Sequence, residues 1–236
     1  MDKEELRELV WKEMDERGVV TFPRPARGRI PNFVGSEKAA ARLRELEVYK
    51  RAEVIMVNPD SAQRAVRKFA LMDGKKLLMA TPRLAGGFIL LDPIEVGDPE
   101  RASGIRGAFE HGTPADLSGL KVDLIVEGSV AVDACGGRVG KGSGWGDLEY
   151  AILRELGAAG EDVMVATTVH DIQILDLQIP MTFHDVPVDI IVTPTRFIYT
   201  QTPHPRPKGI FWEKLDESKL KLPVIQKIKN RGFNFK

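Results

Sequence analysis

A glycine-dense loop between apolar segments and a helix-like segment restricts the fold of this chain most strongly. Residues 122–126 predict a buried strand, 130–132 are a second apolar piece, and 147–153 have the composition of a helix. In the loop between them, 136–146, four glycines stand on alternate positions: Gly140, Gly142, Gly144 and Gly146. Because glycine lacks a β-carbon, the backbone amides of such a loop can approach a ligand closely. The segment predicts an anion-binding loop.

The surroundings of this loop favour phosphate as the anion. Where a loop enters a helix, free N–H groups and the positive end of the helix dipole bind phosphate. Arg138 and Lys141 add mobile positive charge. Asp147 stands where the helix is expected to begin, so it is either the N-cap or a ligand of a phosphate-bound Mg²⁺. Spacing alone favours the cap.

Two common phosphate motifs are excluded by counting. A P-loop needs about four residues between its glycines, followed by Gly-Lys-Ser/Thr. Here three residues separate Gly136 from Gly140, and Gly142 follows the lysine. A dinucleotide fingerprint needs a glycine where Trp145 and Asp147 stand.

Length and charge balance indicate one α/β domain with a well-buried core. The chain has 236 residues, of which 43% are hydrophobic and 29% charged. Lys plus Arg and Asp plus Glu both number 34, which excludes a global field that attracts nucleic acid or a membrane. No apolar run approaches a membrane span, and residues 1–5 are not typical of a signal peptide. A cytoplasmic location is expected.

Cysteine and histidine usage argues against a disulfide, a thiol nucleophile and a zinc site. The single cysteine, Cys135, cannot form an internal disulfide and fits a reducing compartment. No histidine near it in sequence could activate its thiol, so a small packing residue is the simpler interpretation. The four histidines show no metal-ligand spacing with it or with one another.

Strand-like and helix-like segments alternate before the glycine loop. Apolar strands are predicted at 53–57 and 76–80, with amphipathic helices around them. This alternation predicts a mostly parallel sheet with helices on both faces, and it places ligand loops at the carboxyl ends of strands. Residues 58–61 and 81–83 lie at such ends. Residues 95–119 lack periodicity and are predicted to be irregular.

Residues 133–147 resemble the nucleotide loop of the 5-formyltetrahydrofolate cyclo-ligase (methenyltetrahydrofolate synthetase) family. That loop runs phenylalanine-aspartate, glycine-x-arginine-leucine-glycine, and then a glycine-rich turn ending in tyrosine-tyrosine-aspartate; here Trp145 and Gly146 replace the two tyrosines. A Lys-x-x-Leu-Arg pattern at residues 3–7 and the ending at 180–193 resemble the same family in the same order. The resemblance implies a three-layer α/β/α domain, from an archaeal or domain-containing branch.

The resemblance also assigns residues to ATP and Mg²⁺. Lys3 and Arg7 lie one turn apart on one face of a predicted helix, where the alternative is plain solvated charge. By resemblance the ATP residues are Lys3, Arg7, Arg138, Gly140, Lys141, Gly142, Ser143, Gly144, Trp145 and Gly146. The resemblance implies Asp147 and Asp185 as the Mg²⁺ ligands.

The candidates for contact with a reduced folate are Asp60, Arg83 and Trp145. The family's folate-binding glutamate stands fourteen residues before a Gly-Lys pair, and that spacing lands on Asp60 here. Asp60 is shorter by a methylene and could equally be a helix N-cap. Trp145 could instead fill a gap in helix packing.

The family reaction is the ATP-dependent cyclisation of 5-formyltetrahydrofolate to 5,10-methenyltetrahydrofolate. It needs positioned phosphates, Mg²⁺ and a slot for the pterin, but no protein nucleophile. The alternative is a non-catalytic member that binds nucleotide, folate or RNA. The lost tyrosine pair, and Leu148 where an arginine often follows the aspartate, favour that alternative.

Two basic segments lie outside these motifs. Residues 21–35 hold three prolines and three arginines and predict an extended loop, whose arginines could meet a polyanion or a glutamate tail or be merely solvated. A single domain is predicted at 1–202, followed by a basic extension at 203–236. From Arg206 onward, nine Lys or Arg residues face three acidic ones. With its aromatic residues the extension could bind RNA, or pack on the protein's own core or a partner subunit.

Overall fold

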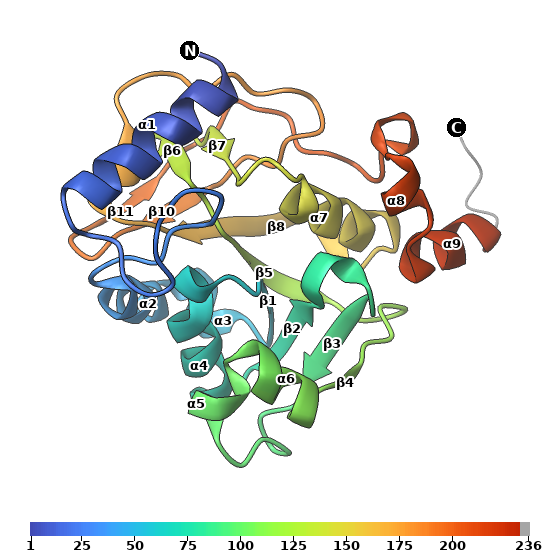
Figure 1. Cartoon of the computed structure of the whole chain (residues 1–236). Coiled ribbons are helices and arrows are strands. Elements are labelled where there is room, and N and C mark those ends of the chain that lie inside the picture. Colours follow the sequence, from blue (N-terminus) through green and yellow to red (C-terminus); the bar gives the residue numbers. More distant parts are fainter. Residues whose placement is uncertain (232–236) are drawn as a thin grey trace.

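An eight-stranded, mostly parallel sheet runs through the computed structural model, which describes residues 1–231 (Figure 1). Its strands are β1 (Val54–Val57), β2 (Lys76–Ala80), β3 (Phe88–Leu91), β4 (Thr113–Pro114), β5 (Val122–Glu127), β8 (Ala159–Thr168), β10 (Ile190–Val192) and β11 (Phe197–Tyr199). They lie in the order β11-β10-β8-β5-β1-β2-β3-β4. The pairings from β10 to β2 are parallel, and those at both edges are antiparallel. The prediction of a mostly parallel sheet is confirmed.

Helices cover both faces of this sheet. Successive side chains of a strand point to opposite sides, so neighbouring residues of one strand pack against different helices. Met56 of β1 belongs to the same buried cluster as the apolar residues of α7 (Trp145–Glu155). Its neighbour Ile55 belongs to the cluster formed with α2 (Ser36–Arg44) and α4 (Arg64–Met72). β1 is buried along its whole length, as a parallel strand covered on both faces must be. The three-layer α/β/α arrangement agrees with the prediction.

The segment predicted to be irregular, residues 95–119, contains two short helices and β4, so that prediction was wrong. Asp98 caps the first helix by accepting a hydrogen bond from the Arg101 amide. Gly107 lets the second helix approach the first, since a β-carbon there would lie 2.0 Å from the Arg101 carbonyl oxygen. The remaining helices and 3₁₀ turns are α1 (Lys3–Glu16), α3 (Glu47–Arg51), η1 (Ser61–Gln63), η2 (Pro82–Leu84), α5 (Pro99–Ala102), α6 (Ile105–His111), η3 (Asp171–Gln173), η4 (Trp212–Lys214), α8 (Glu217–Leu220) and α9 (Pro223–Asn230).

A second, three-stranded sheet divides the predicted glycine loop into two parts. It consists of β6 (Ala131–Asp133), β7 (Arg138–Val139) and β9 (Ile174–Leu175), with α1 packed over it (Figure 1). Asp133 accepts hydrogen bonds from the amides of Cys135 and Gly137 and so fixes the turn between β6 and β7. The first glycines of the run therefore belong to a hairpin, and only those after β7 form the loop that enters α7.

The described part of the C-terminal segment returns to the domain. In Figure 1, α8 and α9 lie beside α7, and Ile225 and Ile228 of α9 are buried in the cluster that contains the apolar side of α7. The aromatic rings of Phe211 and Phe183 meet edge to face, with centroids 4.9 Å apart. These contacts agree with the alternative that the segment packs on its own core. Phe233 and Phe235, which the RNA prediction used, lie outside the described residues.

No helix within residues 1–231 is both long enough and apolar enough to cross a membrane.

Candidate functional site

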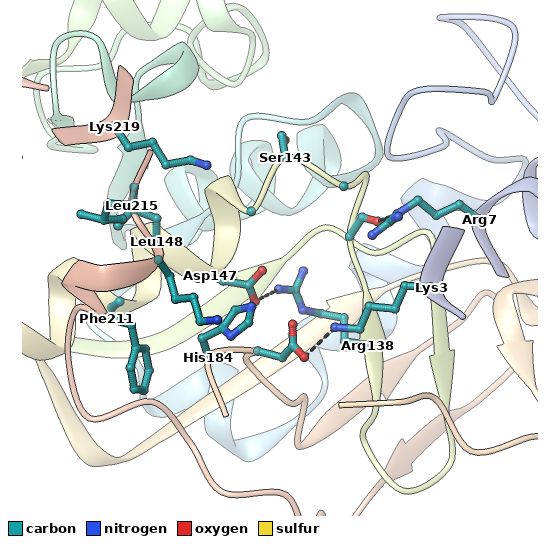
Figure 2. Close-up of a pocket in the computed structure, with 16 residues that line it drawn as sticks. Lys3, Arg7, Arg138, Ser143, Asp147, Leu148, His184, Phe211, Leu215 and Lys219 are labelled. Carbon is teal, nitrogen blue, oxygen red and sulfur yellow. Dashed lines mark hydrogen bonds and ion pairs between the residues drawn. The ribbon is translucent and has the colours of Figure 1, made fainter. Parts of the chain in front are cut away.

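Two cavities flank the glycine loop, and the loop is the wall between them. The cationic pocket, of about 330 Å³, is lined by Lys3, Arg7, Arg138, Lys214 and Lys219, with Asp147, His184 and Asp185 (Figure 2). The carboxyl pocket, of about 530 Å³, is lined by Asn58, Asp60, Glu127 and Glu149, with Arg29, Arg83, Lys141 and Trp145. Five residues line both: Arg138, Gly140, Ser143, Gly144 and Asp147. Both volumes suit small-molecule ligands.

The predicted site residues divide between these pockets. The cationic pocket contains Lys3, Arg7, Arg138, Gly140, Gly142, Ser143, Gly144, Asp147 and Asp185. The predicted ATP residues Lys141, Trp145 and Gly146 line the carboxyl pocket instead, next to the predicted folate residues Asp60 and Arg83. Segments that are distant in sequence therefore meet at the loop, but three of the residues predicted to bind ATP line the other pocket.

The first helix brings two cations to the loop. Asp2 and Glu5 form a capping box that fixes the start of α1. From its first turns, the Lys3 Nζ lies 2.5 Å from the Asp185 Oδ2, and the Arg7 Nε donates to the Gly140 carbonyl oxygen at 2.7 Å. Thr182 also donates to Asp185 from its amide and hydroxyl. Burial would raise the pKa of Asp185, but Lys3 and Thr182 lower it below its ordinary value, so this carboxylate stays charged.

Arg138 is a buried structural hub, and the prediction that its charge is mobile was wrong. Its residue is 5% exposed. The guanidinium donates to the carbonyl oxygens of Gly128 and Val186 and, at 2.6 Å, to the Asp147 carboxylate (Figure 2). Burial alone would lower the pKa of Arg138, but Asp147 and Glu127 outweigh it and raise this pKa. The group is a fixed charge in the shared wall.

Asp147 is not the N-cap, although spacing favoured that role. α7 begins at Trp145, and the cap position is Gly144, whose φ of 66° is the left-handed conformation that glycine tolerates. Asp147 lies in the first turn, where it accepts hydrogen bonds from Arg138 and from the Val186 amide. It is one of two carboxylates at the cationic pocket. Among residues 1–231, no three His, Cys, Asp or Glu side chains are placed to hold a metal ion by themselves.

The structure bears on the two interpretations that the sequence left open for Asp60 and on the two for Trp145. Asp60 occupies the N-cap position of η1, as one of its two interpretations had it, but its side chain makes no capping hydrogen bond. Its carboxylate instead lies 3.1 Å from the Lys141 Nζ. Trp145 packs partly against the core and also lines the carboxyl pocket, with the Lys219 Nζ 5.3 Å from its ring centroid. Its two predicted roles are compatible.

Two buried acids at the carboxyl pocket were not predicted from the sequence. Glu127 ends β5 and is 0% exposed, and Glu149 of α7 is 4% exposed. Asn58 donates to the Glu149 Oε2 at 2.7 Å and accepts from the Gly128 amide. The only sequence signal was the position of each glutamate, one closing an apolar strand and the other on the apolar side of a helix.

The C-terminal segment supplies the far wall of the cationic pocket. Phe211, Lys214, Leu215 and Lys219 line it, and Figure 2 shows Lys219 and Phe211 across the pocket from Lys3 and Arg7. Asp216 holds this wall in place, because its side chain caps α8 and pairs with Lys219 at 3.0 Å. The excess of basic residues in 203–236 was visible in the sequence, but its position at this pocket was not.

Comparisons with known proteins identify the family. A model of the 5-formyltetrahydrofolate cyclo-ligase family matches residues 1–194. The methenyltetrahydrofolate synthase domain-containing proteins of Bos taurus and Homo sapiens are 40% and 39% identical over 98% of this chain, which spans only 63% and 62% of their lengths. The NMR structure of Aquifex aeolicus 5,10-methenyltetrahydrofolate synthetase is 20% identical with a TM-score of 0.53, over 87% of this chain and 96% of that one, and so supports the fold. The chain belongs to the 5-formyltetrahydrofolate cyclo-ligase family.

Proposed function

We propose that this protein catalyses the ATP- and Mg²⁺-dependent cyclisation of 5-formyltetrahydrofolate to 5,10-methenyltetrahydrofolate. The observation that carries the proposal is the wall shared by the two pockets, formed by Arg138, Asp147 and the loop glycines. A nucleotide in the cationic pocket and a folate in the carboxyl pocket would meet across this wall. Holding two reactants in one geometry is the main contribution that phosphoryl transfer requires from a protein.

The cationic pocket has the chemistry of a polyphosphate site. Lys3, Arg7, Lys214 and Lys219 surround it, whereas the loop residues on its wall carry little side-chain bulk. Asp147 and Asp185 would hold Mg²⁺ there, since this ion is commonly bound by one or two carboxylates together with substrate phosphates. Lys3 would then exchange part of its present pairing with Asp185 for contact with phosphate, while Arg138 would keep its pairing with Asp147.

The chain's own contribution is positioning and charge. The nucleotide with its metal would supply the phosphoryl group that makes the formyl oxygen a leaving group. Arg138 cannot move freely, so it would act as a fixed cation beside the transferring group. Ring closure by the N10 amine then needs no protein nucleophile, and the exposed Cys135 does not line either pocket.

The direct test is turnover. Purified protein with ATP, Mg²⁺ and 5-formyltetrahydrofolate is expected to form methenyltetrahydrofolate, followed by its near-ultraviolet absorbance. The non-catalytic alternative would be favoured if the folded protein formed no product but still bound ATP and Mg²⁺, each only in the presence of the other. The replacement of the tyrosine pair by Trp145 and Gly146 is the observation in favour of that alternative.

A substitution on the first helix tests the nucleotide side. Arg7→Ala is expected to lower kcat/KM for ATP roughly tenfold to a hundredfold, because a hydrogen bond to a charged group contributes about 1.5–3 kcal/mol. Lys12→Ala is the matched control, since Lys12 lies on the same helix with its side chain 73% exposed and pairs with Glu16 outside the pocket. Equal kinetics for both variants would remove Arg7 from the site.

The C-terminal wall gives a second test. Lys214→Ala is expected to raise the Kd for ATP about threefold to tenfold, because one partly screened charge contributes about 1 kcal/mol. Lys221→Ala, in the same segment but outside the cationic pocket, is expected to leave this Kd unchanged. Titration calorimetry at two salt concentrations measures both values, and a Lys214 effect that does not shrink with salt would contradict the charge-based explanation.

A further inference from the structure

The far wall of the cationic pocket lies beyond the part of the chain that the family model matches. That model covers residues 1–194, whereas this wall comes from the segment that follows. Its pocket-lining residues are Phe211, Lys214, Leu215 and Lys219. The family match therefore says nothing about what this wall binds.

Contacts on both sides of the lining residues hold this wall against the domain. Before them, Arg206 forms an ion pair with Asp189, and the Ile210 amide donates a hydrogen bond to the Glu155 Oε2 of α7 at 3.0 Å. A β-carbon at Gly209 would lie 2.2 Å from the same oxygen, so a larger residue there would push the Glu155 carboxylate away. After them, the apolar residues of α9 are buried in the core. The wall is therefore in place before a ligand binds.

The cationic pocket has an apolar end. Leu148 and Ala151 of α7 line it together with Phe211 and Leu215 of the C-terminal wall. Figure 2 shows Leu148, Phe211 and Leu215 on the side of the pocket away from the two cations of α1. These four side chains carry no hydrogen-bonding group, so this end offers apolar contact, whereas the end at α1 offers charge.

Aromatic contacts order the residues that the wall presents to the pocket. The Phe211 ring meets the Phe183 ring edge to face, at an interplanar angle of 68°. The Lys214 Nζ lies 5.5 Å from the centroid of the Phe183 ring, and the Lys219 Nζ lies 5.3 Å from that of Trp145. Cations at such distances are attracted to the faces of aromatic rings. The wall therefore presents one ordered ring and two ordered cations.

Leu148 forms the apolar end from the side of α7. In the resembling family an arginine often follows the aspartate of the loop, and here Leu148 stands in its place. It is 6% exposed and belongs to the buried cluster against which Leu215 packs. An arginine would bring a charge to the surface that Leu215 now covers. The departure at Leu148 and the added wall are therefore one arrangement.

We propose that the apolar end formed by Leu148, Ala151, Phe211 and Leu215 holds the nucleobase of the bound nucleotide. A nucleotide joins a flat ring to a chain of phosphates, and this pocket joins an apolar end to a cationic one. With the phosphates at α1 and the glycine loop, the base lies against the C-terminal wall. The choice of a nucleotide as ligand rests on the proposed function. Phe211 and Leu215 are then the residues that favour a nucleotide over free polyphosphate.

Calorimetry with the full chain and Mg²⁺ tests this assignment with ATP, with tripolyphosphate, which lacks the base and ribose, and with 5-formyltetrahydrofolate. Phe211→Ala is expected to weaken ATP binding about fivefold to a hundredfold, as loss of contact between a base and an aromatic ring does, and to change tripolyphosphate binding less than about twofold. Leu215→Ala is expected to weaken ATP binding about threefold or more, again without affecting tripolyphosphate. Phe197→Ala is the control, since this 45% exposed ring of β11 lines neither pocket, and it is expected to change neither affinity.

The ratio of the ATP and tripolyphosphate affinities separates this inference from the proposed reaction. Base-dependent binding of ATP without turnover would support the nucleobase assignment and overturn the reaction. Turnover by a wild-type chain that binds ATP and tripolyphosphate equally well would overturn the assignment and leave the reaction standing. The assignment is also overturned if both variants bind ATP like the wild type, if they lose ATP and tripolyphosphate binding equally, if only 5-formyltetrahydrofolate binding falls, or if the wild-type chain binds neither ATP nor tripolyphosphate.

Discussion

Arg138→Ala is expected to lower the free energy of unfolding by about 3–5 kcal/mol, the cost of breaking a buried ion pair from one side. The substitution leaves Asp147 without its guanidinium and Glu127 without its nearest cation. It also leaves the carbonyl oxygens of Gly128 and Val186 without the donors they now have. Urea unfolding followed by circular dichroism measures the loss.

An exposed arginine provides the comparison. The Arg106 side chain is 92% exposed and pairs with Glu110 one helical turn away. Arg106→Ala is expected to change stability by less than about 1 kcal/mol, as solvent-screened pairs do. Equal midpoints and slopes for the two variants would mean that Arg138 is not the hub described above.

Gly136→Ala is expected to destabilise the fold by more than about 4 kcal/mol, which few single substitutions do. The residue has a φ of +87°, where a side chain is strained, and an added β-carbon would lie 2.5 Å from the Val188 carbonyl oxygen and 2.7 Å from the Thr202 β-carbon. Neither neighbour is the flexible end of a side chain. Thermal and urea unfolding of the variant measure the effect.

Gly144→Ala separates backbone strain from steric overlap. Gly144 has a similar φ of +66°, but no atom lies within 4 Å of an added β-carbon. Gly144→Ala is therefore expected to lower the free energy of unfolding by only about 1–2 kcal/mol. If Gly144→Ala were the more damaging change, the division of the glycine run into a structural hairpin and a ligand-facing loop would be wrong.

The local patterns of the sequence predicted the layers and the positions of the ligand loops. Strand β1 is apolar and short, and the helices beside it have one apolar side, so each element indicates its own burial. Lys3 and Arg7 were also accessible, because their spacing places them on one helix face. Their approach to the loop came from resemblance.

The remaining features depend on contacts that the local sequence does not contain. Arg138 looked like a mobile charge because its neighbours in sequence do not reveal its hydrogen-bond acceptors. Strand pairing and a distant loop bring the carbonyl oxygens of Gly128 and Val186 to it. Asp147 looked like a cap because the helix was expected to begin there, and only the backbone shows that it begins at Trp145 with Gly144 at the cap position. Glu127 and Glu149 gave no signal that they would line one pocket, since this requires the packing of α7 on the sheet.

The walls of the cationic pocket come from parts of the chain that the ribosome synthesises early and late. Lys3 and Lys214, on facing walls, are separated by about 210 positions in the sequence. Closing so long a loop has an entropic cost that only the other contacts of the fold can offset. During synthesis on the ribosome, the walls of this pocket therefore come together only after Lys214 has been made, and a chain that stops before this residue would lack one of them.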